Sequence, residues 1–156
     1  FIMSRKIIAL LTLPLLIILS SWTKDSTYKS NLDDEIAMTN QLIQMINDHR
    51  MNVGKPLLIR NATADRLAEE HTVYMISQNA VSSDNFIDRL EVLEQKENAE
   101  EVAENMVVEI NVEEAMNACL TANWLKVNVE GDFTHTGIAI RSDHSGRYYF
   151  TQIFYK

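Results

Sequence analysis

The side chains of this chain that could take part in chemistry are chiefly histidines and carboxylates, which serve as general bases and metal ligands. His71 lies on the inner face of a predicted helix, where it is either a buried, hydrogen-bonded residue or part of a site. His135 lies in a predicted strand and either faces a binding cleft or covers one side of a sheet. His49 and His144, near a helix end and in a turn, are expected to be solvated.

The remaining candidates are a carboxylate, an amide, a hydroxyl and a thiol. Glu104, near the start of a predicted strand, could act as a base or ligand, or could hold a neighbouring loop by accepting hydrogen bonds. Asn105 beside it is expected to be structural, and Ser83 has no histidine nearby in sequence to activate it as a nucleophile. Cys119 shares a helix stripe with alanines and is expected in the core. The glutamates of residues 91–101 predict a solvated acidic face.

The elements that must position these residues follow from hydrophobic periodicity and turn signals. Helices are predicted over residues 33–53, 62–79, 86–95 and 111–125, with Asn61, the run 82–84 and Asn111 as N-caps of the last three. A strand is predicted over 105–110, and residues 133–141 and 147–155 predict a hairpin around a glycine-containing loop. Helices followed by strand, helix and hairpin predict an α+β fold with an antiparallel sheet.

Composition narrows the possible partners. The 156 residues predict a single domain, and the net charge of −8 disfavours nucleic acid and anionic membranes. A single cysteine excludes an internal disulfide.

The N-terminal segment predicts export. Arg5 and Lys6 precede an apolar run that ends at Ser20 and Ser21, an arrangement typical of a signal peptide, although a permanent anchor is the alternative. We therefore expect a signal or anchor over residues 1–22, a polar linker over 23–34 and the domain over 35–156. Trp22 stands where a bacterial lipoprotein signal has cysteine, so we expect a secreted, periplasmic or envelope protein that is not lipidated.

Several motifs occur in the order of a known family. They are Asn47-x-x-Arg50 with Gly54 and Leu57, Ala68-x-x-His71-x-x-x-Met75-x-x-x-Asn79, Ala103-Glu104-Asn105, Trp124, Gly137-Ile138-x-Ile140, and residues 149–154. Together they resemble the CAP superfamily of cysteine-rich secretory, antigen-five and pathogenesis-related proteins. The resemblance implies a three-layer α-β-α sandwich with a cleft.

The resemblance also implies that the cleft is degenerate. In many members two histidines and acidic residues meet there and can bind a divalent metal. Ser83 stands where the first histidine is expected, and the segment with the second is missing after Lys126. Of the cleft residues only Glu104 is retained. A site that has lost both imidazoles lacks the ligands that zinc needs, so we expect neither a metal nor a cofactor.

Three functional hypotheses remain open. The first is an exported, non-enzymatic module that binds a lipid, glycan or protein in its cleft, with Glu104, Ser83, Asn105, His71 and His135 as candidate cleft residues and no assigned catalytic residue. The second is a cell-envelope hydrolase that uses Glu104 with His71 or His135. The third is a decayed family copy without activity.

Overall fold

The structure is a computed structural model that describes residues 13–143 and 145–156. It divides into two units, residues 1–34 and 35–156. Helix α1 spans Leu13–Asn52, and therefore begins before residue 33, where the periodicity predicted its start. The expected linker, residues 23–34, is thus helical, and its role as a linker stays a prediction. The signal or anchor expected over residues 1–22 also stays a prediction, and it lies partly outside the described residues. No described helix is long and apolar enough to cross a membrane.

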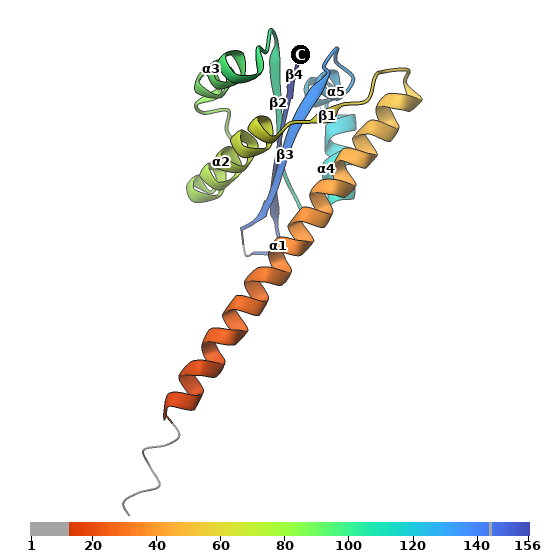
Figure 1. Ribbon diagram of the computed structural model, residues 1–156. Helices are drawn as coiled ribbons and strands as arrows, with labels where there is room; N and C mark the ends of the chain where they lie inside the picture. The colour runs from red at the N-terminus through yellow and green to blue at the C-terminus, as the bar shows by residue number, and fades with distance from the viewer. Residues whose placement is uncertain (1–12, 144) are drawn as a thin grey trace, which may run out of the picture. The chain divides into compact units, whose positions relative to one another are not determined.

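A four-stranded sheet forms the centre of the second unit (Figure 1). Its strands are β1 (Ile59–Arg60), β2 (Val102–Glu109), β3 (His135–Ser142) and β4 (Tyr148–Tyr155), in the order β1-β3-β4-β2. The predicted hairpin is confirmed, since β3 and β4 pair antiparallel with Ile140 opposite Phe150. β4 also pairs antiparallel with β2, and the short β1 joins β3 in parallel, which makes the sheet mixed.

Helices cover both faces of this sheet. α2 (Ala62–Gln78) and α3 (Phe86–Glu97) pack on one face through residues such as Leu67 and Leu93. The C-terminal part of α1 packs on the other face with α4 (Val112–Thr121) and α5 (Asn123–Val129). The expected α+β, three-layer sandwich is therefore what the chain adopts.

The apolar periodicity of the predicted helices and strands places seven large residues in the core, and all of them are buried: Leu42, Ile46, Leu67, Met75, Ile138, Ile140 and Phe150. Cys119 is also buried, and the apolar surroundings raise the pKa of its thiol to about 11. Two N-caps are confirmed as well, because Asn61 and Asn111 accept hydrogen bonds from the backbone N–H groups of Ala64 and Glu114.

Three local predictions are wrong. Helix α3 is preceded by Asn85 in a left-handed conformation rather than capped by residues 82–84, and it continues through Glu97. The helix predicted over 111–125 is two helices, because Ala122 adopts an extended backbone conformation between α4 and α5. Strand β2 begins at Val102, three residues early, because its pairing with β4 extends over eight residues.

Gly137 sets the distance between α2 and the sheet. A Cβ atom at this position would lie 2.1 Å from the carbonyl carbon of Ala64 and 2.4 Å from its oxygen. Real Cβ atoms do not approach backbone atoms so closely, so only glycine lets the first turn of α2 lie directly on β3.

Candidate functional site

Glu104 is held in a buried ion pair with Arg89. The guanidinium of Arg89 on α3 donates from Nε to Oε1 at 2.6 Å and from Nη2 to Oε2 at 2.7 Å. The side chains are only 7% and 3% exposed. Both carboxylate oxygens of Glu104 are therefore engaged by a group that cannot give up its charge.

Arg89 also anchors the loop before α3. Its Nη1 donates to the backbone carbonyl of Asp84 at 2.7 Å. One of the two alternatives for Glu104 was that it holds a neighbouring loop by accepting hydrogen bonds from it; instead Glu104 positions Arg89, and Arg89 holds the loop. Ser83, in this loop, is exposed and its carbonyl oxygen accepts a hydrogen bond from the N–H of Phe86.

His71 is buried on the inner face of α2 and donates from Nε2 to the carbonyl oxygen of Ser82 at 2.7 Å. Burial is the main cause that lowers its pKa, so the ring is neutral at pH 7. Its hydrogen bond matches the structural alternative that the sequence left open for this residue. The Oγ of Ser82 is itself buried and has no hydrogen-bond partner among the described residues, so a substrate cannot reach it.

A pocket of about 270 Å³ lies between α2 and α3, and we call it the α2–α3 pocket. It is lined by Arg66, Leu67, Glu70, His71, Tyr74, Asn85, Asp88, Arg89 and Val92. Apolar and aromatic side chains and the pair of Arg66 with Glu70 form its walls. The structure thus brings His71 and Arg89 to one pocket.

His135 is not part of this pocket. It pairs with Tyr155 on β4, stacks on the Tyr155 ring at a centroid distance of 4.9 Å, and its Nδ1 is 2.8 Å from the Thr134 hydroxyl. Glu104 pairs with Ile153 on the other side of β4, so a whole strand separates it from His135. Neighbouring strands lie about 5 Å apart, so β2 and β3, with β4 between them, are about 10 Å apart. The side chains of Glu104 and His135 therefore cannot act on one bond.

Asn105 lies on the opposite face of the sheet from Glu104, because neighbouring strand residues alternate. Its Nδ2 donates to the carbonyl of Leu125 at 3.0 Å, and its Oδ1 accepts from Asn128 Nδ2 at 2.8 Å. These bonds attach α5 to β2. The structure therefore separates Asn105 from the α2–α3 pocket and gives it an architectural place.

The cleft residues do not fit the metal that the family resemblance implies. The permanent positive charge of Arg89 is paired with Glu104, the one cleft carboxylate retained. The side chain of Ser83 offers a hydroxyl group and no nitrogen ligand. In the part of the chain that the structure describes, no group of three or more His, Cys, Asp and Glu lies close enough to hold a metal ion.

The motif Asn47-x-x-Arg50 builds a different corner of the fold, which we call the α1–α5 corner. Arg50 is fully buried and donates to the carbonyls of Pro56 (2.8 Å), Val129 (2.7 Å), Gly131 (3.0 Å) and Phe133 (3.0 Å). Desolvation lowers the pKa of this guanidinium, which nevertheless stays charged.

Two neighbours complete the α1–α5 corner. The amide of Asn47 exchanges two hydrogen bonds with the backbone of Leu58. His49, expected to be solvated, instead lies 2.8 Å from Glu130 and is only 22% exposed. His144 lies outside the described residues. The motif therefore joins the end of α1 to two loops.

The residue that sequence reasoning missed is Arg89. Its spacing carried a signal, since it lies three residues after Phe86 and four before Leu93, on the inner stripe of the helix. A charged residue at such a position needs a buried partner, which in the structure is Glu104.

Comparison with solved structures shows the same fold in bacterial proteins. An outer surface protein from Borrelia burgdorferi is 17% identical over 75% of this chain and 90% of its own, with a TM-score of 0.68. An extracellular protein containing an SCP domain from Bacillus anthracis is 21% identical, with a TM-score of 0.68, over 78% of this chain and 41% of its own. A cysteine-rich secretory protein from Staphylococcus aureus is 15% identical, with a TM-score of 0.62, over 78% of this chain and 38% of its own.

Sequence comparison agrees with the fold. No curated protein matches the chain significantly. Residues 43–154, which hold the Arg50, Glu104 and Gly137 motifs, match the family called CAP, the cysteine-rich secretory protein family. The chain belongs to the cysteine-rich secretory protein (CAP) family.

Proposed function

We propose that this protein is an exported, metal-independent binding module whose ligand site is the α2–α3 pocket. The observation that carries the proposal is the two-pronged ion pair between Arg89 and Glu104. It occupies the carboxylate that would otherwise coordinate a metal or accept a proton. The pocket is lined by Arg89 and not by Glu104, whose carboxylate lies behind Arg89 and holds α3.

Two further features support binding rather than catalysis. The Nε2 of His71 is committed to the Ser82 carbonyl, and His135 lies beyond β4. A volume of about 270 Å³ is at the lower limit for small-molecule sites, so the pocket suits one part of a larger lipid, glycan or peptide. Export is supported by the N-terminal pattern and by the descriptions of the three bacterial proteins as outer surface, extracellular and secretory.

The proposal is tested with the full chain by NMR titration against lauric acid, an N-acetylglucosamine tetramer and a pool of heptapeptides. Binding to one class should shift the resonances of residues lining the pocket. Val92→Phe, which fills the pocket, should weaken that binding at least about tenfold. Val73→Phe is the matched control, because Val73 is exposed on α2 and does not line the pocket.

The metal part is tested by calorimetry with zinc chloride. We expect no binding at micromolar zinc. Micromolar binding that disappears in Glu104→Ala would contradict the proposal and favour the envelope hydrolase. Failure of all three ligand classes to shift the pocket resonances would favour the decayed copy.

A further inference from the structure

The two edges of the sheet differ in how many of their outward backbone groups are hydrogen-bonded. The β3 edge is covered by such partners. Alternate residues of an edge strand point their backbone N–H and C=O groups away from the sheet. On β3 these residues are Thr136, whose carbonyl accepts from the N–H of Asn61, then Ile138, Ile140 and Ser142. Every one of the four has a partner on its outer side.

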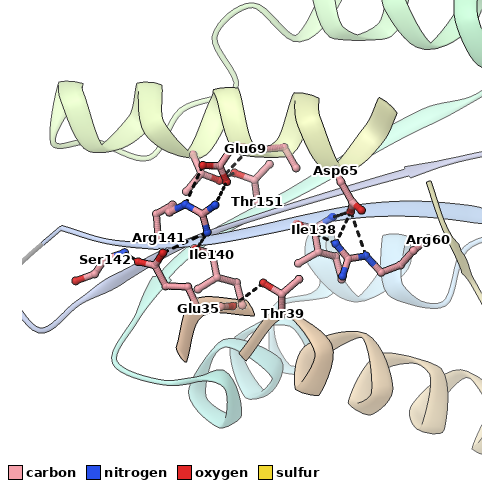
Figure 2. A network of polar contacts seen from close by, with 12 residues as sticks. Glu35, Thr39, Arg60, Asp65, Glu69, Ile138, Ile140, Arg141, Ser142 and Thr151 are labelled. Carbon is pink, nitrogen blue, oxygen red and sulfur yellow. Dashed lines mark hydrogen bonds and ion pairs between the residues drawn. The ribbon is translucent and has the colours of Figure 1, made fainter. Parts of the chain in front are cut away.

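Figure 2 shows how side chains close the β3 edge beyond β1. Asp65 accepts from the N–H of Ile138 at 2.9 Å, and Arg60 donates to the Ile138 carbonyl at 3.5 Å. Arg141 donates to the Ile140 carbonyl at 2.7 Å. Glu35 accepts from the N–H of Ser142 at 2.9 Å. Such coverage prevents another strand from adding at this edge.

The β2 edge lacks this coverage. Glu101 exchanges hydrogen bonds with Lys156 beside β4, so the outward residues of β2 are Val102, Glu104, Met106 and Val108. The Glu104 carbonyl accepts from Asn128 at 3.3 Å. Among the described residues, the outward N–H and C=O groups of the other three make no hydrogen bond.

Solvent reaches the main chain of this edge. All four outward residues are partly exposed, whereas Asn105 and Val107 between them are buried. Glu104 is the clearest case, because its side chain is only 3% exposed, so the exposure of the residue comes from its backbone. The unpaired groups are thus open to an added strand.

Helix α5 offers an apolar surface next to this edge. Asn128 of α5 reaches the Glu104 carbonyl, and Trp124 lies one turn earlier on the same side of the helix. Trp124 is 74% exposed, and Val127 beside it is 63% exposed. An aromatic side chain so exposed is a common anchor for a partner.

The charge around the edge selects the partner. Residues 100–114 contain Glu100, Glu101, Glu104, Glu109, Glu113 and Glu114 and neither lysine nor arginine. Glu104 and Glu101 are neutralised by Arg89 and Lys156. The ends of β2 therefore remain acidic.

A second copy of the chain fits this edge poorly. Antiparallel self-pairing through all four outward residues would place Glu109 of each copy opposite Glu101 of the other, where the single charge of Lys156 faces two carboxylates. Like charges directly opposite each other destabilise a strand pair. The net charge of −8 on each copy adds to this repulsion.

We propose that the β2 edge binds an extended polypeptide segment of another protein, with apolar residues at its centre and lysine or arginine at both ends. The segment adds as a fifth strand beside β2. Its main chain pairs with Val102, Met106 and Val108, its apolar side chains contact Trp124, and its basic side chains face the acidic ends of β2. This mode of recognition derives affinity from backbone hydrogen bonds and specificity from alternate side chains.

The test uses the full chain and a capped peptide of about nine residues, the length of a long strand, with valines at its centre and lysines at both ends. At saturation, NMR hydrogen exchange at the N–H groups of Val102, Met106 and Val108 should slow at least about tenfold. The N–H groups of Ala103 and Val107 already point to β4 and serve as internal references.

Two controls isolate the edge. A peptide of the same sequence with N-methylated valines keeps its charge but loses backbone donors, and should bind at least about tenfold more weakly. Replacing Glu100 and Glu109 by Gln should weaken binding about threefold or more, whereas Glu91→Gln, on the exposed face of α3, should not.

The outcomes decide between this site and others. Equal binding of the methylated peptide would overturn the proposal. So would protection of the β2 edge in the absence of peptide that increases with protein concentration, because it would identify a second copy as the occupant. Binding that is lost in Val92→Phe would place the peptide in the α2–α3 pocket instead, and would leave the proposed function standing.

Discussion

Two buried arginines, Arg50 in the α1–α5 corner and Arg89 beside the α2–α3 pocket, are held in opposite ways. Arg50 donates only to backbone carbonyls, which no substitution can remove. Arg89 is neutralised by the carboxylate of Glu104. At Arg50 the guanidinium therefore joins segments of the backbone. At Arg89 it neutralises Glu104, the acid that the family resemblance assigns to a cleft. The difference shows that a residue retained from the motif, such as Glu104, can keep its position in the fold while its carboxylate is no longer free to react.

The largest expected effect is at Arg50. Arg50→Met leaves two buried and two part-buried carbonyls without donors, and at one or more kcal/mol each the loss should be about 4–5 kcal/mol of unfolding free energy. Urea denaturation measures it. Arg66→Met is the control, because Arg66 forms an exposed pair with Glu70 and should change stability by at most about 1 kcal/mol. A loss at Arg50 no greater than at Arg66 would contradict the assignment of the corner.

Glu104 should come next, and it should differ from Arg50 by being rescuable. Glu104→Leu leaves the Arg89 charge buried without a partner, which should destabilise the domain by about 3–5 kcal/mol. The double variant with Arg89→Leu removes both charges and should recover most of that loss. If the double variant were as unstable as the sum of the singles, the pair would not be the reason that Glu104 is buried.

Gly137 tests whether close backbone approach holds α2 on β3. Gly137→Ala should destabilise the domain by about 1–3 kcal/mol, because its Cβ would meet backbone atoms of Ala64. Adding Ala64→Gly should give no recovery, since the clash is with the Ala64 main chain. Recovery in thermal denaturation would show that side-chain packing, rather than backbone approach, sets the contact.

The smallest expected effect is a pH dependence from His71. Its pKa is lowered in the folded state, so below its ordinary value near 6.5 the unfolded chain binds the extra proton first. Stability should therefore fall as the pH decreases from about 7, with a slope from this residue of at most about 1.4 kcal/mol per pH unit. His71→Gln should reduce the slope between pH 7 and 5. An unchanged slope would show that the ring is already solvated.

Local signals explain which parts of the fold could be predicted. The caps at Asn61 and Asn111 depend on residues three positions apart, and the hairpin depends on two adjacent β-rich runs around a turn. The break at Ala122 could not be predicted in this way. It coincides with α5 being attached to β2 through Asn105 and Asn128, residues from a different element.

Residue identity, spacing and periodicity by themselves predicted the α+β class, the hairpin and the core, and the resemblance of the motifs to the family implied the three layers. The tertiary structure alone decided what Glu104 does, since its partner Arg89 lies fifteen residues away on another element and the pair exists only when α3 packs on β2. It also decided that His135 lies beyond β4 and that one sheet edge is open. Each of these depends on strand order, which the one-dimensional pattern does not encode.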